Sequence, residues 1–233
     1  MPLINSFAKY SIIAIVFSWG LASAATLQLS AGVQSSEFLG GVNLADDTPG
    51  VTFNVDWAFD QGGFTGADCY ASNVSSDLGL ARGCGLYVGY FNAFDDNNAL
   101  SLQLTRHEYS RAFNRSWDFT EFSTSWHLSK KSSLSASYAE KWLGTPYDSV
   151  NLRADTQISL TESLGLNLSA NVTELESGAP VDNLISAEIT LIYLSGRWTT
   201  ELGLVYTDRD QQQMFPFDID EPDALLSVSY RLY

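Results

Sequence analysis

The feature that most constrains this chain is a period-two alternation of apolar and polar residues that recurs from one end to the other. Between positions 51 and 59 the apolar side chains run from Val51 to Phe59 on odd positions, and between 164 and 172 they run from Leu164 to Val172 on even positions. Successive side chains of a β-strand point to opposite faces, so each stretch predicts a strand with one apolar and one polar face. The twelve stretches lie at 26–34, 50–59, 64–72, 85–94, 99–109, 116–128, 133–142, 147–160, 163–173, 183–194, 197–207 and 223–233.

The connections between these predicted strands alternate in length. Short turns such as 60–63, 95–98 and 195–196 alternate with longer segments such as 35–49 and 208–222. An even number of strands joined in this way is typical of outer-membrane barrels, in which short periplasmic turns alternate with longer outer loops. The sequence therefore predicts an all-β fold, a single closed antiparallel transmembrane β-barrel of about 12 strands.

Alternating strands also occur in soluble β-sandwiches, so a second feature has to separate the two folds. Many aromatic residues fall near the predicted strand ends, which fits two aromatic girdles at the membrane interfaces, whereas a sandwich would place most of them mid-strand in its core. These residues are Phe59, Phe64, Tyr70, Tyr87, Tyr90, Phe91, Trp117, Trp126, Trp142, Tyr147, Tyr193, Trp198, Tyr206 and Tyr230.

The first 24 residues resemble a secretory signal peptide and are set apart from the barrel. Lys9 precedes an apolar run, and Ala22-Ser23-Ala24 supplies the small residues of a cleavage site. The run is shorter than the roughly 20 residues of a membrane-spanning helix, although an uncleaved anchor is the alternative. We expect cleavage near Ala24, export to the bacterial outer membrane, and one barrel domain at 25–233.

The net charge and the absence of known catalytic motifs exclude several classes of function. The formal net charge of −15 argues against nucleic acid as a partner. No nucleotide-binding, zinc-protease or serine-hydrolase motif occurs, so we expect no cofactor, no metal and no catalytic residue. The alternative is a lipid-modifying barrel enzyme built around His107 with Ser110 close by, but the alternation places His107 on the polar face of its strand.

Cys69 and Cys84 are the only cysteines of the chain. Because an exported protein passes through an oxidising compartment, a disulfide between them is expected, with two free thiols as the alternative. Closing a loop of this length would stabilise the fold by about 3 kcal/mol in the chain-entropy model.

Several segments spread over the chain resemble the TorF-type outer-membrane porin family. They are Phe38–Val42 with Asp46-Asp47 and Pro49-Gly50, Gly63-Phe64, Ala71–Val74, Leu86–Tyr90, Trp117–Glu121 and Leu134–Tyr138. The family usually has an arginine where this chain has Leu39, and the cysteine pair looks like a local addition. The resemblance implies a barrel fold and a transport role, and it names no catalytic group.

The polar faces of the predicted strands would line the lumen, where acids slightly outnumber bases. This predicts a porin-like channel for passive or weakly cation-selective passage of small solutes. A filled structural or adhesive barrel is the alternative, in which Arg153 and Arg231 pair with acidic residues and block the interior. The predicted lumen residues are Asn54, Asp56, Gln103, His107, Asn151, Arg153, Asp155, Glu188, Glu201 and Arg231.

The partners expected of such a barrel are outer-membrane lipid, lipopolysaccharide, small solutes and the barrel assembly machinery. An acidic outer loop near 208–223 would meet lipopolysaccharide phosphates through divalent ions. Barrels of this kind commonly end in an aromatic residue, as Tyr233 does, but Arg231 shares its face. Either the last strand turns Leu226, Tyr230 and their apolar neighbours to lipid, or a bulge changes its register.

Overall fold

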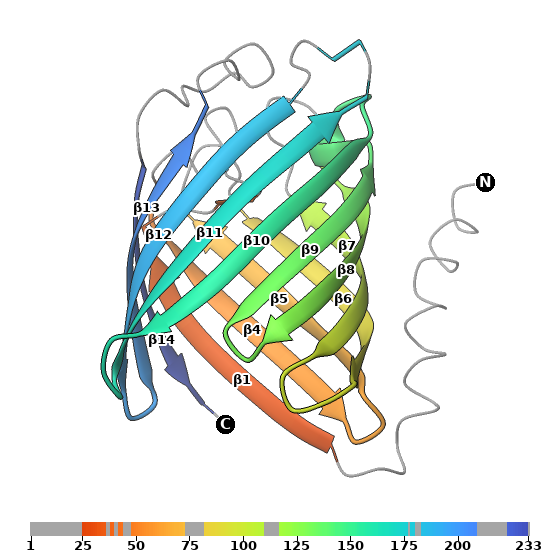
Figure 1. Cartoon of the computed structure of the whole chain (residues 1–233). Coiled ribbons are helices and arrows are strands. Elements are labelled where there is room, and N and C mark those ends of the chain that lie inside the picture. The colour runs from red at the N-terminus through yellow and green to blue at the C-terminus, as the bar shows by residue number, and fades with distance from the viewer. Residues whose placement is uncertain are drawn as a thin grey trace, which may run out of the picture.

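The computed structural model describes residues 25–35, 38–39, 42–43, 48–72, 82–109, 117–176, 178–179, 183–208 and 223–232. Twelve long strands form one closed antiparallel barrel, in which each strand pairs with its neighbours in the chain and the last strand pairs back with the first (Figure 1). The predicted fold class and strand number are confirmed. The barrel strands are β1 (Ala25–Gln34), β4 (Gly50–Phe59), β5 (Gly63–Ser72), β6 (Arg82–Ala93), β7 (Ala99–Tyr109), β8 (Phe119–Ser129), β9 (Ser132–Glu140), β10 (Ser149–Ser159), β11 (Leu164–Leu175), β12 (Asn183–Ser195), β13 (Trp198–Thr207) and β14 (Asp223–Arg231).

The connections at one end of the barrel are tight turns. They span only 60–62, 94–98, 130–131, 160–163 and 196–197, and Figure 1 shows them at the same end as the start of β1. Gly62 and Gly196 have φ angles of +87° and +63°, a conformation that glycine adopts without steric cost. The connections at the opposite end are longer, as the alternation of connection lengths predicts.

The outer surface of the barrel is apolar. Leu102, Leu104 and Phe122 are exposed by 41, 44 and 50%, and similar side chains repeat at every second position round the barrel. A soluble protein seldom exposes a continuous apolar belt of this kind, whereas hydrocarbon accommodates it. Within the described residues, no helix has the length and apolarity to cross a bilayer.

Closure of the barrel gives the backbone N–H and C=O groups of the first and last strands hydrogen-bond partners, which hydrocarbon cannot provide. β14 pairs with β13 on one side and with β1 on the other, and Leu226 lies opposite Leu202 on the apolar face. The last strand therefore turns its apolar set outward in regular register, and Arg231 takes the other face opposite Ser30. This decides between the two alternatives for the last strand, while Tyr233 lies outside the described residues.

A short 3-10 helix, η1 (Trp142–Gly144), interrupts the connection between β9 and β10. Lys141 and Leu143 have φ angles of +52° and +51°, so the chain turns sharply where β9 ends. The predicted strand 133–142 is therefore wrong at its end, because β9 stops at Glu140 and Trp142 folds back. Trp142 and Leu143 are buried, and η1 packs against β8.

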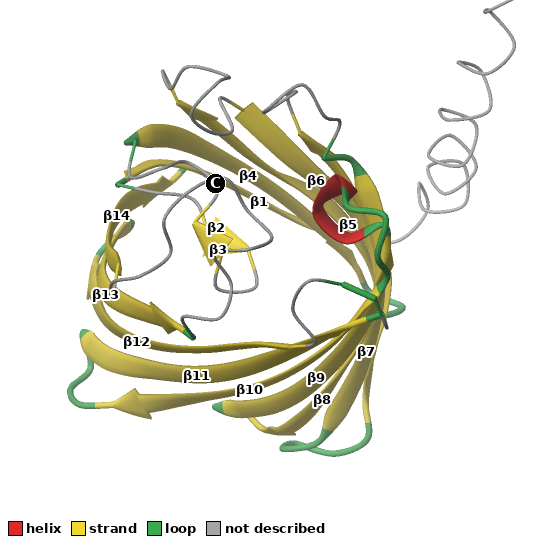
Figure 2. Ribbon diagram, turned by 90° about the horizontal axis from the view of Figure 1, so that it is seen from above, coloured by secondary structure: helices red, strands yellow, loops and turns green. Residues whose placement is uncertain are grey.

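Two short strands, β2 (Phe38–Leu39) and β3 (Val42–Asn43), lie in the connection from β1 to β4 and pair with each other in antiparallel fashion. Viewed from above, this hairpin lies inside the ring of barrel strands (Figure 2). The sequence predicts only a long outer connection at 35–49 and does not predict this hairpin.

Candidate functional site

The inner face of the barrel carries the candidate site. Side chains that oppose one another across paired strands share a face, so the pairing register follows each face round the wall. Phe53 is 45% exposed on the outer face, and its neighbours Asn54 and Thr52 therefore point inward. Following the register from Asn54 through every strand defines one continuous inner face.

All ten lumen residues predicted from the sequence lie on this inner face. The register brings together Arg153 with Asp155 and Glu188, and it leaves His107, Gln103 and Arg231 apart on other strands. The members in strand order are Asn54, Asp56, Gln103, His107, Asn151, Arg153, Asp155, Glu188, Glu201 and Arg231.

The centre of the β10–β12 wall holds an ionic cluster. Arg153 Nε donates to both carboxylate oxygens of Asp155 at 2.9 and 3.0 Å, and Arg153 Nη2 lies 3.8 Å from Glu188 Oε2. Glu188 also accepts a hydrogen bond from Thr190 Oγ1 at 2.6 Å. The Arg153 side chain is 38% exposed and its two partners are 25% exposed, so solvent reaches the inner wall at mid-strand.

A second charged group lies on β4–β6. The Tyr87 hydroxyl donates to Asp56, and Asp68 lies near both. Asp68 was missed from the sequence, because the stretch 64–72 is rich in small residues and alternates only weakly. The signal that could have found it is its two-residue spacing from Gly66 and Tyr70 on the same face.

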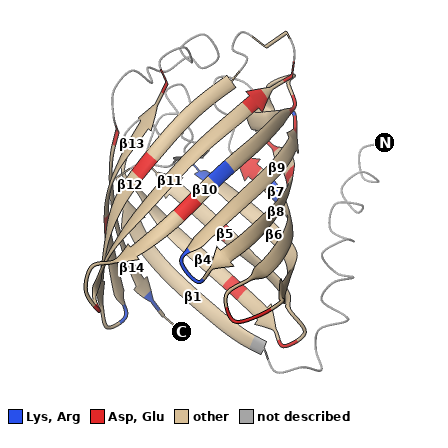
Figure 3. Ribbon diagram, viewed as in Figure 1, with Lys and Arg blue, Asp and Glu red and all other residues tan. Residues whose placement is uncertain are grey.

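The inner face as a whole is acidic. Figure 3 shows charged residues scattered over the strands. In the described strands, Arg153 and Arg231 are the inward Arg or Lys residues. The inward acids are Asp56, Asp68, Glu121, Asp155, Glu188, Glu201 and Asp223, of which Asp68, Glu121 and Asp223 were not predicted.

The neutral polar residues bond along the wall. Asn151 Nδ2 donates to Thr173 Oγ1 at 2.8 Å, and Gln103 Nε2 donates to Thr105 Oγ1 at 2.9 Å. Asn54 Nδ2 donates to Ser30 Oγ at 3.3 Å. The bonds of Asn151 and Asn54 join neighbouring strands, whereas Gln103 and Thr105 lie on the same strand, β7.

His107 lies in an aromatic stack near the outer end of β7. Its ring centroid is 4.3 Å from that of Phe119 and 6.0 Å from that of Tyr109, and Nε2 is buried without a hydrogen-bond partner among the described residues. Ser110, the serine considered with it, lies outside the described residues. In the described part of the chain, no group of three His, Cys, Asp or Glu residues is placed to hold a metal ion.

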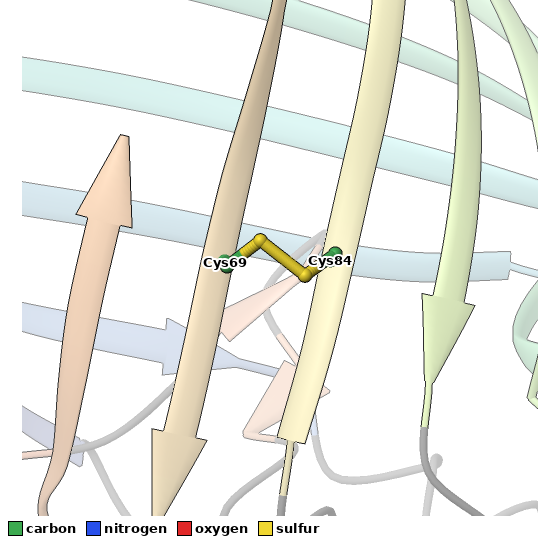
Figure 4. The surroundings of a disulfide bond; sticks show 2 residues. All are labelled: Cys69 and Cys84. Carbon is green, nitrogen blue, oxygen red and sulfur yellow. A yellow bond between two sulfur atoms is a disulfide. The ribbon is translucent and has the colours of Figure 1, made fainter. Parts of the chain in front are cut away.

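Cys69 and Cys84 form a disulfide between β5 and β6 (Figure 4). Their Cα atoms are 4.1 Å apart in directly opposed positions. Cys69 also lies opposite Phe53, so the bond is on the outer face and takes no part in lining the interior.

The outer loop between β9 and β10 is ordered around one carboxylate. The Tyr138 hydroxyl and the backbone N–H of Lys141 donate to Asp148 at 2.6 and 3.1 Å. These bonds hold the pKa of Asp148 below its ordinary value.

The aromatic girdle prediction holds for only some of its residues. Trp126, Tyr193, Trp198 and Tyr206 are half-exposed on the outer face. Phe64, Tyr70, Tyr87 and Phe91 instead point inward by register, and Trp117 and Trp142 are buried in outer connections. Position near a strand end does not determine the face, which depends on register.

The fold is similar to that of solved porins. A KdgM porin structure has a TM-score of 0.56 at 9% identity and covers 88% of this chain and 99% of its own. A KdgM porin in complex with disordered oligogalacturonate gives 0.55 at 9% identity, covering 89% and 100%. A NanC porin gives 0.57 at 11% identity, covering 88% and 98%. At such identities the likeness establishes the fold alone.

Sequence comparisons give no closer assignment. No protein-family model matches the chain, and no curated protein matches it. The TorF-type resemblance therefore stays a prediction.

Proposed function

We propose that the protein is an outer-membrane channel for passive passage of small solutes, with a weak preference for cations. The observation that carries this proposal is the solvent exposure of Arg153 at the middle of β10, 38% on the inner face. A filled barrel would bury such a side chain, as small barrels fill their interior with packed residues. The apolar outer face supports placement in lipid.

The cation preference follows from the inner charges. Arg153 is neutralised by Asp155 and Glu188, while Asp68 and Glu201 make no ion pair among the described residues. Fixed negative charge along a pore raises the local concentration of cations and lowers that of anions. The preference is weak because Arg153 and Arg231 offset part of the negative charge of the inner face.

The proposal includes the expected route to the membrane. We infer cleavage near Ala24, passage through the periplasm, and insertion by the barrel assembly machinery, with lipopolysaccharide in contact with the outer rim. The regular outward register of Leu226 and its apolar neighbours supports insertion of the last strand.

The test is conductance of the purified mature protein in planar bilayers. Discrete steps with a reversal potential of cationic sign in a KCl gradient are expected, and heat-unfolded protein is the control. Silence over a wide voltage range would favour the alternative, a filled structural or adhesive barrel. The burial of Phe119 and Ala139 at the outer end of the inner face, where η1 packs against β8, favours that alternative.

A further inference from the structure

The inner face of β6 is lined with aromatic rings, some of its own and some from the adjacent strands. Between Gly83 and Phe91 each inward position is either glycine or aromatic, and each glycine lies beside a ring from an adjacent strand. A Cβ on Gly83 would overlap the Tyr109 ring, and a Cβ on Gly89 would overlap the Phe64 ring. The inward residues of β6 are Gly83, Gly85, Tyr87, Gly89, Phe91 and Ala93.

The rings occupy the space that side chains would otherwise take. His107 Nδ1 lies 3.6 Å from the Cβ position of Gly85. Phe64 and Tyr87 have ring centroids 6.3 Å apart, and at the turn end of the strand Phe91 lies 5.6 Å from His127. The rings on and beside β6 form an aromatic line, which runs from Tyr109 and His107 past Tyr87 and Phe64 to Phe91. From Gly83 to Phe91 this aromatic line covers roughly 26 Å of strand, comparable to the apolar band of an outer-membrane barrel.

The wall across the barrel has the opposite chemistry. In strand order β12 is farthest from β6, and Figure 2 shows the two on opposite sides of the ring. In their middle parts the inner faces of β10–β12 carry hydroxyl, amide and charged groups and no aromatic ring, while apolar residues such as Leu175, Leu184 and Ile192 lie towards the strand ends. The polar residues of the middle part are Asn151, Arg153, Asp155, Gln157, Asn167, Ser169, Asn171, Thr173, Ser186, Glu188 and Thr190.

An aromatic wall facing a hydroxyl and amide wall matches the chemistry of a sugar ring. The C–H groups on a pyranose face are weakly positive and lie well against the negative face of an aromatic ring. The hydroxyl groups round its edge donate to and accept from amides, hydroxyls and carboxylates. An inorganic ion would use the charges and leave the aromatic line without a role.

We propose that the channel selects neutral saccharides, and that the aromatic line on β6 is the surface along which they pass. This deepens the proposed function and rests on it. Saccharides that carry acid groups are disfavoured, because Asp56 and Asp68 flank Tyr87 and would repel a carboxylate beside the rings. The solute class therefore differs in charge from the oligogalacturonate in the similar KdgM structure.

The test measures block of the KCl current in planar bilayers by three uncharged or acidic probes. The probes are a linear neutral glucose oligomer, an oligogalacturonate of the same length, and polyethylene glycol of the same mass. Half-block by the neutral oligomer is expected at a concentration at least tenfold below that of either other probe. Equal block by the neutral oligomer and polyethylene glycol would overturn the proposal, and so would stronger block by oligogalacturonate.

Variants locate the effect on the aromatic line. Phe64→Leu and Tyr87→Leu are expected to raise the half-block concentration of the neutral oligomer several-fold, while Tyr87→Phe, which keeps the ring, retains block. Phe53→Leu on the outer face is the matched control and should change nothing. Folding of each variant is checked by heat-modifiable migration on gels. If one of the two leucine variants does not fold, the other one supplies the test.

The two proposals fail in different ways. If the wild-type protein shows no KCl current, both the channel proposal and this inference are wrong. A conducting protein whose block is unaffected by both leucine variants overturns the saccharide inference alone. A stronger block by an organic ammonium ion of similar size than by the neutral oligomer would also overturn it.

Discussion

Cys69 of β5 and Cys84 of β6 oppose each other directly on the outer face, with Cα atoms 4.1 Å apart. The bond joins two strands that are already paired, and it closes a loop with a sequence separation of 15 residues. Its contribution therefore comes mainly from restricting the unfolded chain, since the strands remain paired without it.

We predict that Cys69→Ser with Cys84→Ser lowers the stability of the folded barrel by about 3 kcal/mol and leaves conductance unchanged. The measurement is the urea concentration at which the folded band disappears in heat-modifiable gel migration. Wild-type protein treated with reductant should behave like the double variant. An unchanged midpoint in both samples would contradict the prediction.

The pairing of Gly83 with Tyr109 gives a second prediction. Gly83→Ala would force the Tyr109 ring from its position and should destabilise the barrel by about 1–3 kcal/mol, as overpacking does. Gly165→Ala is the matched control, because the nearest atom to its Cβ would lie at an ordinary 3.5 Å on the same inner face. Equal midpoints for the two variants would show that the ring moves freely.

Removing the inward cation on β10 should strengthen the cation preference. Arg153→Ala leaves Asp155 and Glu188 without their guanidinium partner. A unit charge several ångströms from the path contributes about 0.5–1 kcal/mol in a water-like dielectric, so the cation-to-anion permeability ratio should rise roughly threefold.

The readout for this variant is the reversal potential in a KCl gradient. Lys130→Ala, which removes the same charge from the turn between β8 and β9, is the control and should have a smaller effect. A shift towards anions in Arg153→Ala would mean that the inner acids do not face the conducting path.

The turn between β6 and β7 supplies a pH-dependent prediction. Asp95 accepts hydrogen bonds from the backbone N–H groups of Asn97 and Asn98 at 2.7 and 2.8 Å, which hold its pKa below the ordinary value of 3.8. A lowered pKa in the folded state means that the charged form stabilises the fold. The contribution is present above pH 3.8 and is lost as the pH falls through the lowered pKa.

Asp95→Ala should therefore reduce stability at pH 7 and become indistinguishable from wild type in acid below the folded pKa. Unfolding midpoints at both pH values are the measurement. Asp96→Ala in the same turn makes no such bonds in the described structure and should have little effect at either pH. A difference between Asp95→Ala and wild type that persists in acid would mean that packing, not charge, is responsible.

The strand count and the inner residues of β10 could be predicted from the sequence, because polar and apolar residues alternate from Val150 to Ala154. Asn151 and Arg153 stand between apolar neighbours, and Asp155 continues the same face although Thr156 follows it, so only one register is compatible with lipid on the other side. The same reasoning found Glu188 and Glu201 on neighbouring strands.

The aromatic line on β6 could not be predicted in the same way. In 83–91 both faces contain apolar residues, so Tyr87 and Tyr90 look equivalent although they point in opposite directions. Which glycine lies under which ring depends on pairing between strands that only the closed barrel fixes. The inward position of Asp68 could not be predicted for a related reason. Small residues surround it, so its strand has no clear apolar and polar faces.

The pairing of β1 with β14 has a consequence for biosynthesis. Ser30 lies opposite Arg231, so the barrel closes only when β1 pairs with β14, and every intermediate before that step has two unpaired strand edges. Such long-range pairing is slow, and exposed borders invite aggregation. The barrel therefore cannot close before β14 is available, and until then both unpaired edges are open to pairing with other chains.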